Sequence, residues 1–208
     1  MKYFPSCKAL ATAAILCFSF SAFSQIEFKL HWMDKEQQWG VFARLEEGAT
    51  INPFNIVGSG QVTLLAPTGT SFRGMHSVSG EWVQNAFIQA PEEKPDTDYI
   101  SFGLISNDPE IMLLPDQETL LFTFKPRDGN CPEFLSLINN DDPLAIYPNS
   151  ANSNAGNDLS VMDPRTMKMY NFARNYMPEA WNCKPGEVIA LGEYLTGKDR
   201  YKAKILKP

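Results

Sequence analysis

The sequence predicts an all-β protein, an antiparallel β-sandwich with only short helical turns. Three observations predict it. Apolar and polar residues alternate along short segments, Pro and Gly separate these segments at even spacing, and aromatic residues make up 12% of the chain. Alternation with a period of two sends one set of side chains to a core and the other to solvent. Evenly spaced short strands favour two packed antiparallel sheets, with a closed barrel as the alternative.

The first two strands are expected at residues 25–32 and 39–46, where QIEFKLHW and WGVFARLE alternate cleanly. A short polar turn, MDKEQQ, joins them, which is typical of a β-hairpin. Trp32 and Trp39 share the apolar face of this hairpin, so we expect both to be buried. His31 lies on the polar face and is expected at the surface.

Further strands are expected in segments that keep the alternation and end at Pro, Gly or polar residues. These segments are residues 61–67, 81–90, 98–106 and 118–126, with weaker candidates at 158–162 and 187–191. Helical turns are expected only at residues 132–138 and 166–176. The charged segment at residues 184–208 is expected to be a tail or an edge strand.

The N-terminus has the pattern of an export signal. Lys2 and Lys8 provide positive charge, residues 9–23 are mostly apolar, and the small residues Ala22 and Ser24 flank the position that signal peptidase reads. We therefore expect residues 1–24 to be a cleaved signal peptide and residues 25–183 to be one domain. The apolar run is too short for a membrane anchor, which needs about 20 residues. The expected location is secreted or at the cell surface.

The net charge narrows the possible partners, and the cysteines predict a disulfide. A formal net charge of −6 repels nucleic acid and anionic membranes, and loss of the signal makes the chain more acidic. Two cysteines remain after cleavage, and an oxidising compartment favours a disulfide between Cys131 and Cys183. The chain-entropy treatment gives a loop of about 50 residues a stabilisation of roughly 4 kcal/mol. Half of a zinc site is the alternative, but no further ligands lie nearby.

No residue pattern indicates catalysis. The two histidines, His31 and His76, lack metal-binding spacing, and the sequence contains no nucleophile-elbow, phosphate-loop or dinucleotide-binding motif. A pair of glycosidase carboxylates meets only in three dimensions, so spacing cannot reveal one. We expect a non-enzymatic protein, with a glycan or peptide hydrolase as the weakest alternative.

A polar segment at residues 139–161 is the main candidate for specific chemistry. Its carboxylate and amide oxygens are of the kind that Ca²⁺ binds. The candidate ligands are Asp141, Asp142, Asn152, Asn154, Asn157 and Asp158. Their spacing does not fit an EF-hand, because aligning Gly156 with its glycine leaves Met162 in the position of the glutamate. Turn formation is the favoured interpretation, since Asn, Asp, Ser and Gly all favour turns.

Aromatic residues near strand ends or in loops could stack on a ligand such as a sugar. The candidates are Trp82, Tyr147, Tyr176 and Trp181. An aromatic residue at an alternating strand position more often belongs to the core, and nothing in the sequence places these four on one face.

Several segments together resemble a known family. They are residues 58–67, 98–106, 118–126, 140–143, 152–161 and 181–183. With these segments the chain resembles the single cohesin-like domains of exported Bacteroidetes proteins, over residues 26–183. The resemblance implies a jelly-roll sandwich, like that of cohesins and several carbohydrate-binding modules, and a binding or scaffolding role. It carries over no individual binding residue.

The expected function is therefore a secreted or cell-surface binding module that recognises an extracellular protein partner. A carbohydrate-binding module that uses exposed aromatic residues is the alternative. No cofactor is expected, apart from the Ca²⁺ that the polar segment could hold.

Overall fold

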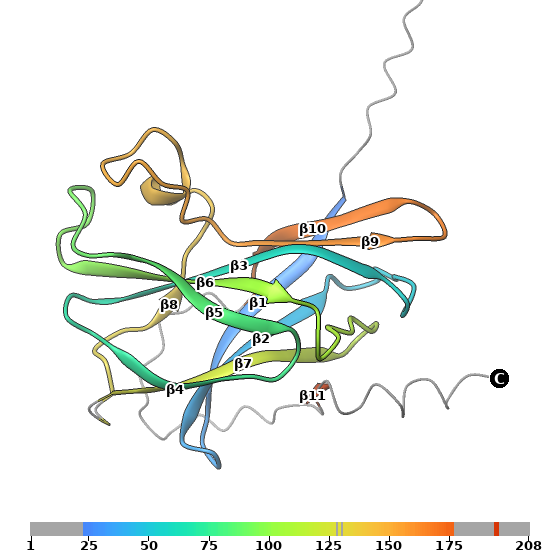
Figure 1. Ribbon diagram of the computed structural model, residues 1–208, viewed down its shortest axis with the longest axis horizontal. Helices are drawn as coiled ribbons and strands as arrows, with labels where there is room; N and C mark the ends of the chain where they lie inside the picture. The colour runs from blue at the N-terminus through green and yellow to red at the C-terminus, as the bar shows by residue number, and fades with distance from the viewer. Residues whose placement is uncertain (1–22, 128, 130, 177–193, 196–208) are drawn as a thin grey trace, which may run out of the picture.

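The computed structural model describes residues 23–127, 129, 131–176 and 194–195, and within them the protein is all-β. Figure 1 shows the strands in chain order. They are β1 (Phe23–Met33), β2 (Gln38–Leu45), β3 (Ile56–Pro67), β4 (Phe72–Ser77), β5 (Glu81–Ile88), β6 (Thr97–Ser106), β7 (Glu118–Pro126), β8 (Ser136–Leu137), β9 (Asp158–Asp163), β10 (Lys168–Asn175) and β11 (Tyr194–Leu195). One 3-10 turn, η1, covers Pro143–Ala145.

The strands form one hydrogen-bonded path that folds over on itself. Its order is β11-β7-β2-β1-β10-β9-β3-β6-β5, with β4 added to β7 and β8 added to β3. Most pairs are antiparallel, but β1 pairs with β10 and β7 pairs with β11 in parallel. The first and last long strands therefore lie side by side and link the two layers of the sandwich (Figure 1).

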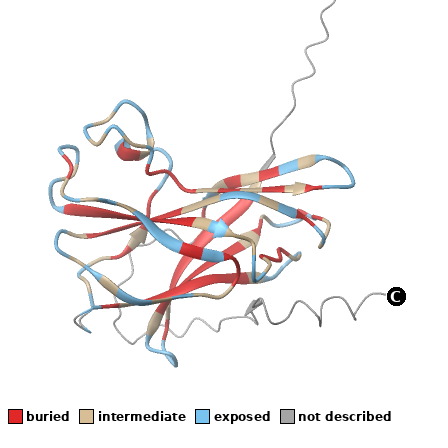
Figure 2. Cartoon of the chain, viewed as in Figure 1, coloured by how far each residue is buried: buried red, intermediate tan, exposed pale blue. Residues whose placement is uncertain are grey.

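Aromatic side chains from facing strands fill the core between the two layers. Phe102 of β6 lies with its ring centroid 5.0 Å from that of Phe122 on β7, and Trp82 of β5 lies 5.4 Å from Phe122. These contacts show that β5 and β6 face β7 across the core. Figure 2 shows the buried stretches running along the inner strands. The prediction of an all-β sandwich with an aromatic core is confirmed.

The hairpin predicted from the first two alternating segments is also confirmed. β1 pairs with β2 from Ile26↔Leu45 to Met33↔Gln38 without a break in register. Trp39 is fully buried as expected, whereas Trp32 at the end of β1 is only half-buried. The pairing of β1 with β2 begins just after the expected cleavage position, so it does not depend on the signal segment.

The prediction of helical turns was wrong at two places. Residues 168–175 of the second candidate segment form strand β10, because Tyr170 and Phe172 alternate into the core and the backbone pairs with β9 and β1. The first segment contributes the short strand β8, which pairs with β3. In both cases tertiary pairing decides the conformation of a segment whose local preference is weak. Strand β4 was not predicted.

The outer face of β1 is buried, which corrects the expectation that its polar residues face solvent. Glu27, Lys29 and His31 are only 1%, 4% and 7% exposed. Ion pairs offset the free-energy cost of burying these charges: Glu27 lies 2.8 Å from both Arg44 and Arg174. Buried charges of this kind need a partner, and a single sequence does not reveal cross-strand partners.

Some predicted features lie outside the described residues. They are Trp181, Cys183, the strand candidate at residues 187–191 and most of the tail at residues 184–208. Cys131 lies within the described part, but its predicted pairing with Cys183 stays a prediction. In the described part of the chain there is no helix with the length and apolar character that crossing a membrane requires.

Candidate functional site

The polar segment that follows β8 packs on the outer face of the β3–β6 pair. Leu144 and Ala155 from this segment contact Leu65 of β3 and Tyr99 of β6, and the four form a second, smaller apolar cluster with Ile138. Figure 1 shows the segment with η1 above the end of these strands. The segment therefore buries apolar groups that the sheet would otherwise expose.

Asn157 supplies hydrogen bonds on the edge of β3 away from β6, in the gap between the positions paired with β9 and with β8. Its side-chain oxygen accepts from the backbone N–H of Thr63 at 2.9 Å, and its amide nitrogen donates to the carbonyl of Ile138 at 2.8 Å. Asn157 itself is 4% exposed. A side chain with both a donor and an acceptor can replace a missing strand contact in this way. Its role in the fold is to bridge the gap between β9 and β8.

Asp142 is likewise occupied by contacts within the protein. Its carboxylate accepts from the Leu144 N–H and the Tyr99 hydroxyl, both at 3.0 Å, and lies 2.5 Å from the Lys94 ammonium. The first contact caps η1. Burial, followed by the charge of Asp142, raises the pKa of the Tyr99 phenol well above its usual range. Tyr99 thus stays a neutral donor to this carboxylate.

The other four candidate calcium ligands are either exposed or hydrogen-bonded to other residues of the protein. Asp141 and Asn152 are exposed, the Asn154 side chain accepts from the Gly156 N–H, and Asp158 accepts from the Ser59 hydroxyl. Within the described ranges no group of three or more His, Cys, Asp or Glu side chains could hold a metal ion. These contacts favour the turn interpretation of the segment, and a calcium site stays an untested expectation.

Two of the four aromatic candidates are buried, which corrects their assignment as ligand-stacking residues. Trp82 is 3% exposed and its indole N–H donates to the Ser79 carbonyl at 2.8 Å. Tyr176 is 7% exposed and its hydroxyl donates to Glu118 at 2.8 Å. Tyr147 is 67% exposed beside η1. The described residues therefore place no two of the candidates together on the surface.

A buried charged cluster surrounds His31 on the outer face of β1. The Lys29 ammonium lies 2.5 Å from the Glu118 carboxylate, and the Arg44 guanidinium lies 3.7 Å from the Tyr176 ring centroid. Burial, with a further contribution from Lys29, lowers the pKa of His31. Burial also lowers the pKa of Lys29, against the opposing effect of Glu118. Because the members pair with one another, the cluster is a structural network.

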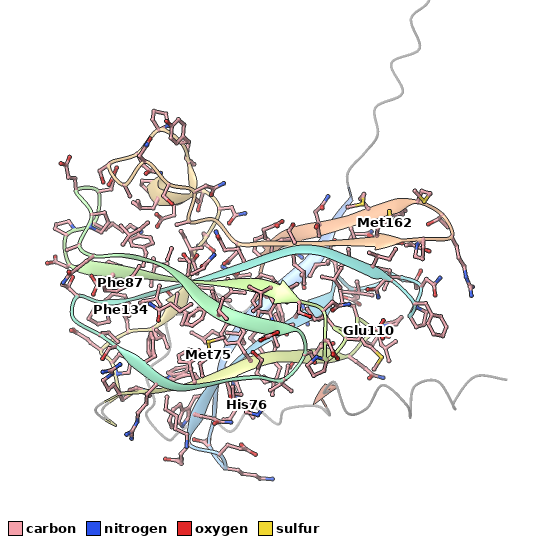
Figure 3. The ribbon with its side chains drawn as sticks, viewed as in Figure 1. Met75, His76, Phe87, Glu110, Phe134 and Met162 are labelled. Atoms are coloured by element: carbon pink, nitrogen blue, oxygen red, sulfur yellow. The ribbon has the colours of Figure 1, made fainter. Side chains whose placement is uncertain are left out.

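An exposed apolar row crosses three strands on the outside of the sheet. Ile56 of β3 is the register partner of Met162 on β9, and Met162 is the register partner of Met169 on β10. Ile56 and Met169 are 51% and 42% exposed, and Met162 is half-buried between them. We call these three residues the methionine row. Figure 3 labels Met162 on the β9–β10 hairpin.

The methionine row faces outward because the neighbouring register positions face the core. Val57, Val161 and Tyr170 are each one residue away and pair across the same three strands, and Val161 and Tyr170 are buried. Side chains alternate between the two faces of a sheet, so the row cannot also reach the core. Sequence reasoning missed the row. Its signal was the alternation in DLSVMD, where Met162 falls in the same set as Asp158 and Ser160.

No protein-family model, curated protein or solved structure matches this chain. The resemblance to cohesin-like domains therefore stays an expectation from the sequence segments, and the site must be interpreted from its own chemistry.

Proposed function

We propose that this protein is a secreted or cell-surface, non-catalytic binding module that recognises a protein partner through the methionine row. The observation that carries the proposal is an exposed apolar row formed by Ile56, Met162 and Met169 in direct register across three strands. Export and the scaffolding role are predictions from the sequence. The methionine row is the surface that would contact the partner.

Methionine suits a surface that accommodates another protein. Its unbranched side chain adapts to different shapes, and its sulfur makes favourable contacts with aromatic rings. A rigid sheet fixes the positions of the three side chains while their ends stay adaptable. Polar groups flank the row along the same face, where Ser59 donates to Asp158 at 2.6 Å and lies 2.9 Å from Ser160. An apolar centre with a polar rim is the usual composition of a protein interface.

The carbohydrate alternative has less support from the candidate aromatic residues. Trp82 and Tyr176 lie in buried positions with their polar atoms already bonded, which leaves Tyr147 as the exposed member among the described candidates. The platform expected from these candidates needs several of their ring faces turned to solvent on one side. The hydrolase alternative has no supporting observation.

The experiment compares the exported wild-type protein with the double variant Ile56→Lys/Met169→Lys as bait in its own culture medium and cell-surface extract. The matched control is Val83→Lys/Ile105→Lys, which adds the same charge at residues that are 37% and 59% exposed on β5 and β6. All four positions are at the surface, so each substitution should change the free energy of unfolding by less than about 0.5 kcal/mol. Thermal melts verify this before binding is measured.

The proposal expects one defined protein that wild type and the β5–β6 control both enrich and that the row variant loses. The purified partner should then bind wild type at least about tenfold more tightly than the row variant, since a charge placed in an apolar interface costs more than 1.4 kcal/mol. Equal binding by both double variants, or no enriched protein, would contradict the proposal.

A further inference from the structure

Two positive side chains face each other on β4 and β7, with no acidic partner among the residues that the structure describes. Arg73 and Lys125 are direct register partners in this antiparallel pair. Like charges in such positions destabilise a sheet. Neither side chain makes a hydrogen bond or an ion pair within the described residues, although the chain carries 24 acidic residues against 18 basic ones. Since these two cations are unpaired among the described residues, this part of an acidic protein has positive charge available for a ligand.

The two cations border a pocket of about 260 Å³. Trp32 at the end of β1 and Gln37 in the β1–β2 turn line the same pocket. Trp32 is the half-buried exception among the tryptophans of the described strands, because Trp39 and Trp82 are both buried. The indole of Trp32 therefore forms part of a wall that solvent can reach, next to groups with charge and hydrogen-bonding capacity.

The chemistry of these four residues specifies a ligand class. Arg73 and Lys125 suit a carboxylate or sulfate group, which forms stronger hydrogen bonds with cations than with neutral donors. The flat indole of Trp32 suits an apolar ring face, and the Gln37 amide can both donate to and accept from hydroxyl groups. Pockets for drug-sized molecules have volumes of about 300–1,000 Å³, so this smaller one fits a single ring.

We propose that this pocket binds an acidic saccharide, with the acid group between Arg73 and Lys125 and the sugar ring against Trp32. The pocket is separate from the methionine row. Figure 1 places the β1–β2 turn and the β9–β10 hairpin at different ends of the molecule. The acidic-saccharide proposal and the protein-partner proposal can therefore fail independently.

The test measures binding of the full chain to four probes by isothermal titration calorimetry. An oligogalacturonate carries carboxylates, a sulfated galactan oligosaccharide carries sulfates, a neutral galactan oligosaccharide carries no charge, and oligo-aspartate carries charge without a sugar ring. The proposal expects binding of at least one acidic saccharide and neither of the last two probes. Raising the salt concentration should weaken this binding, because partly exposed charges are screened.

The site variant is Arg73→Gln/Lys125→Gln, and each single variant is measured beside it. The control is Arg165→Gln, which removes one positive charge at an exposed position in the β9–β10 turn. We expect the double variant to weaken binding by roughly tenfold or more, from the loss of two charge-assisted contacts, and the control to stay within about twofold. Trp32→Leu should weaken saccharide binding while a thermal melt shows the fold retained.

Three results would overturn the proposal. One is the absence of binding by both acidic saccharides, and another is equal binding by wild type and the Arg73→Gln/Lys125→Gln protein. The third is oligo-aspartate binding as tightly as the acidic saccharides, which would assign the pocket to acidic peptides. Preference between the carboxylate and sulfate probes identifies the source of the acid group.

Discussion

The side-chain oxygen of Asn157 lies 2.9 Å from the backbone nitrogen of Thr63 and accepts its hydrogen bond. Both residues are buried. On the edge of β3 away from β6, Thr63 has no strand partner, because β9 pairs with β3 before Thr63 and β8 pairs with it after Thr63. A residue that sequence analysis names as a metal-ligand candidate is thus part of the β-ladder. The Asn157 amide in the polar segment therefore completes the hydrogen bonding of the sheet.

Asn157→Ala should lower the free energy of unfolding by about 2–3 kcal/mol, because the buried Thr63 N–H loses its acceptor and cannot reach water. Urea denaturation of wild type and variant measures the difference. Asn154→Ala is the control: its side chain accepts one bond from Gly156 at a more exposed position, so its effect should stay below about 1 kcal/mol. Equal stability of wild type and Asn157→Ala would show that the ladder does not need this side chain.

Removal of calcium should leave the melting temperature unchanged. Asp142 and Asn157 are occupied by Lys94, Tyr99, Thr63 and other protein groups, so binding an ion would require breaking these contacts. Differential scanning calorimetry with millimolar calcium and with excess chelator makes the comparison. A ligand that binds only the folded state must raise the melting temperature with its concentration. A calcium-dependent rise would therefore restore the metal-site interpretation.

Stability should fall as the pH drops below about 6.5, because burial lowers the pKa of His31 below that ordinary value. Well above pH 6.5 the histidine is neutral in both the folded and the unfolded state. Below it the unfolded chain takes up a proton that the folded protein resists, so the free energy of unfolding decreases. The carboxylates of Glu93 and Asp163 have lowered pKa values too, but their effect begins only below their ordinary values of 4.5 and 3.8.

Urea denaturation of His31→Gln between pH 7.5 and 5 checks the assignment, with His76→Gln as the control at an exposed position on β4. The His31→Gln protein should lose most of the slope in this range, whatever its stability at pH 7.5. The His76→Gln protein should keep the slope of wild type. An unchanged slope in His31→Gln would assign the pH dependence to another group.

The sequence predicted those strands in which residue type and burial agree. In β2, Trp39 and Val41 lie two residues apart on one face of the strand, and both are fully buried. The prediction failed where contacts between residues far apart in the sequence decide which side chains are buried. Glu27 reads as a solvent-facing residue, yet Arg174, far along the chain, pairs with it through the parallel β1–β10 contact. Only the assembled sheet brings these two residues together.

The candidate site was harder to predict for the same reason. Trp82 was expected near the surface, but the bare backbone of Gly60 gives its indole ring room in the core: a Cβ on Gly60 would lie 2.9 Å from that ring. The methionine row depends on the register of β3, β9 and β10, which hydrophobicity along one strand does not specify. The alternation in β9 groups Met162 with Asp158 and Ser160, but it does not reveal Ile56 and Met169 as its neighbours.

Oxidative footprinting of the methionines tests the central claim that the methionine row is the binding surface. Intact wild-type protein is treated with dilute hydrogen peroxide, alone and with the enriched partner, and the sulfoxide at each methionine is quantified by mass spectrometry. The account predicts that the partner slows oxidation of Met162 and Met169, while Met75 on β4 oxidises at an unchanged rate. Unchanged oxidation of Met162 and Met169 in the saturated complex would contradict it.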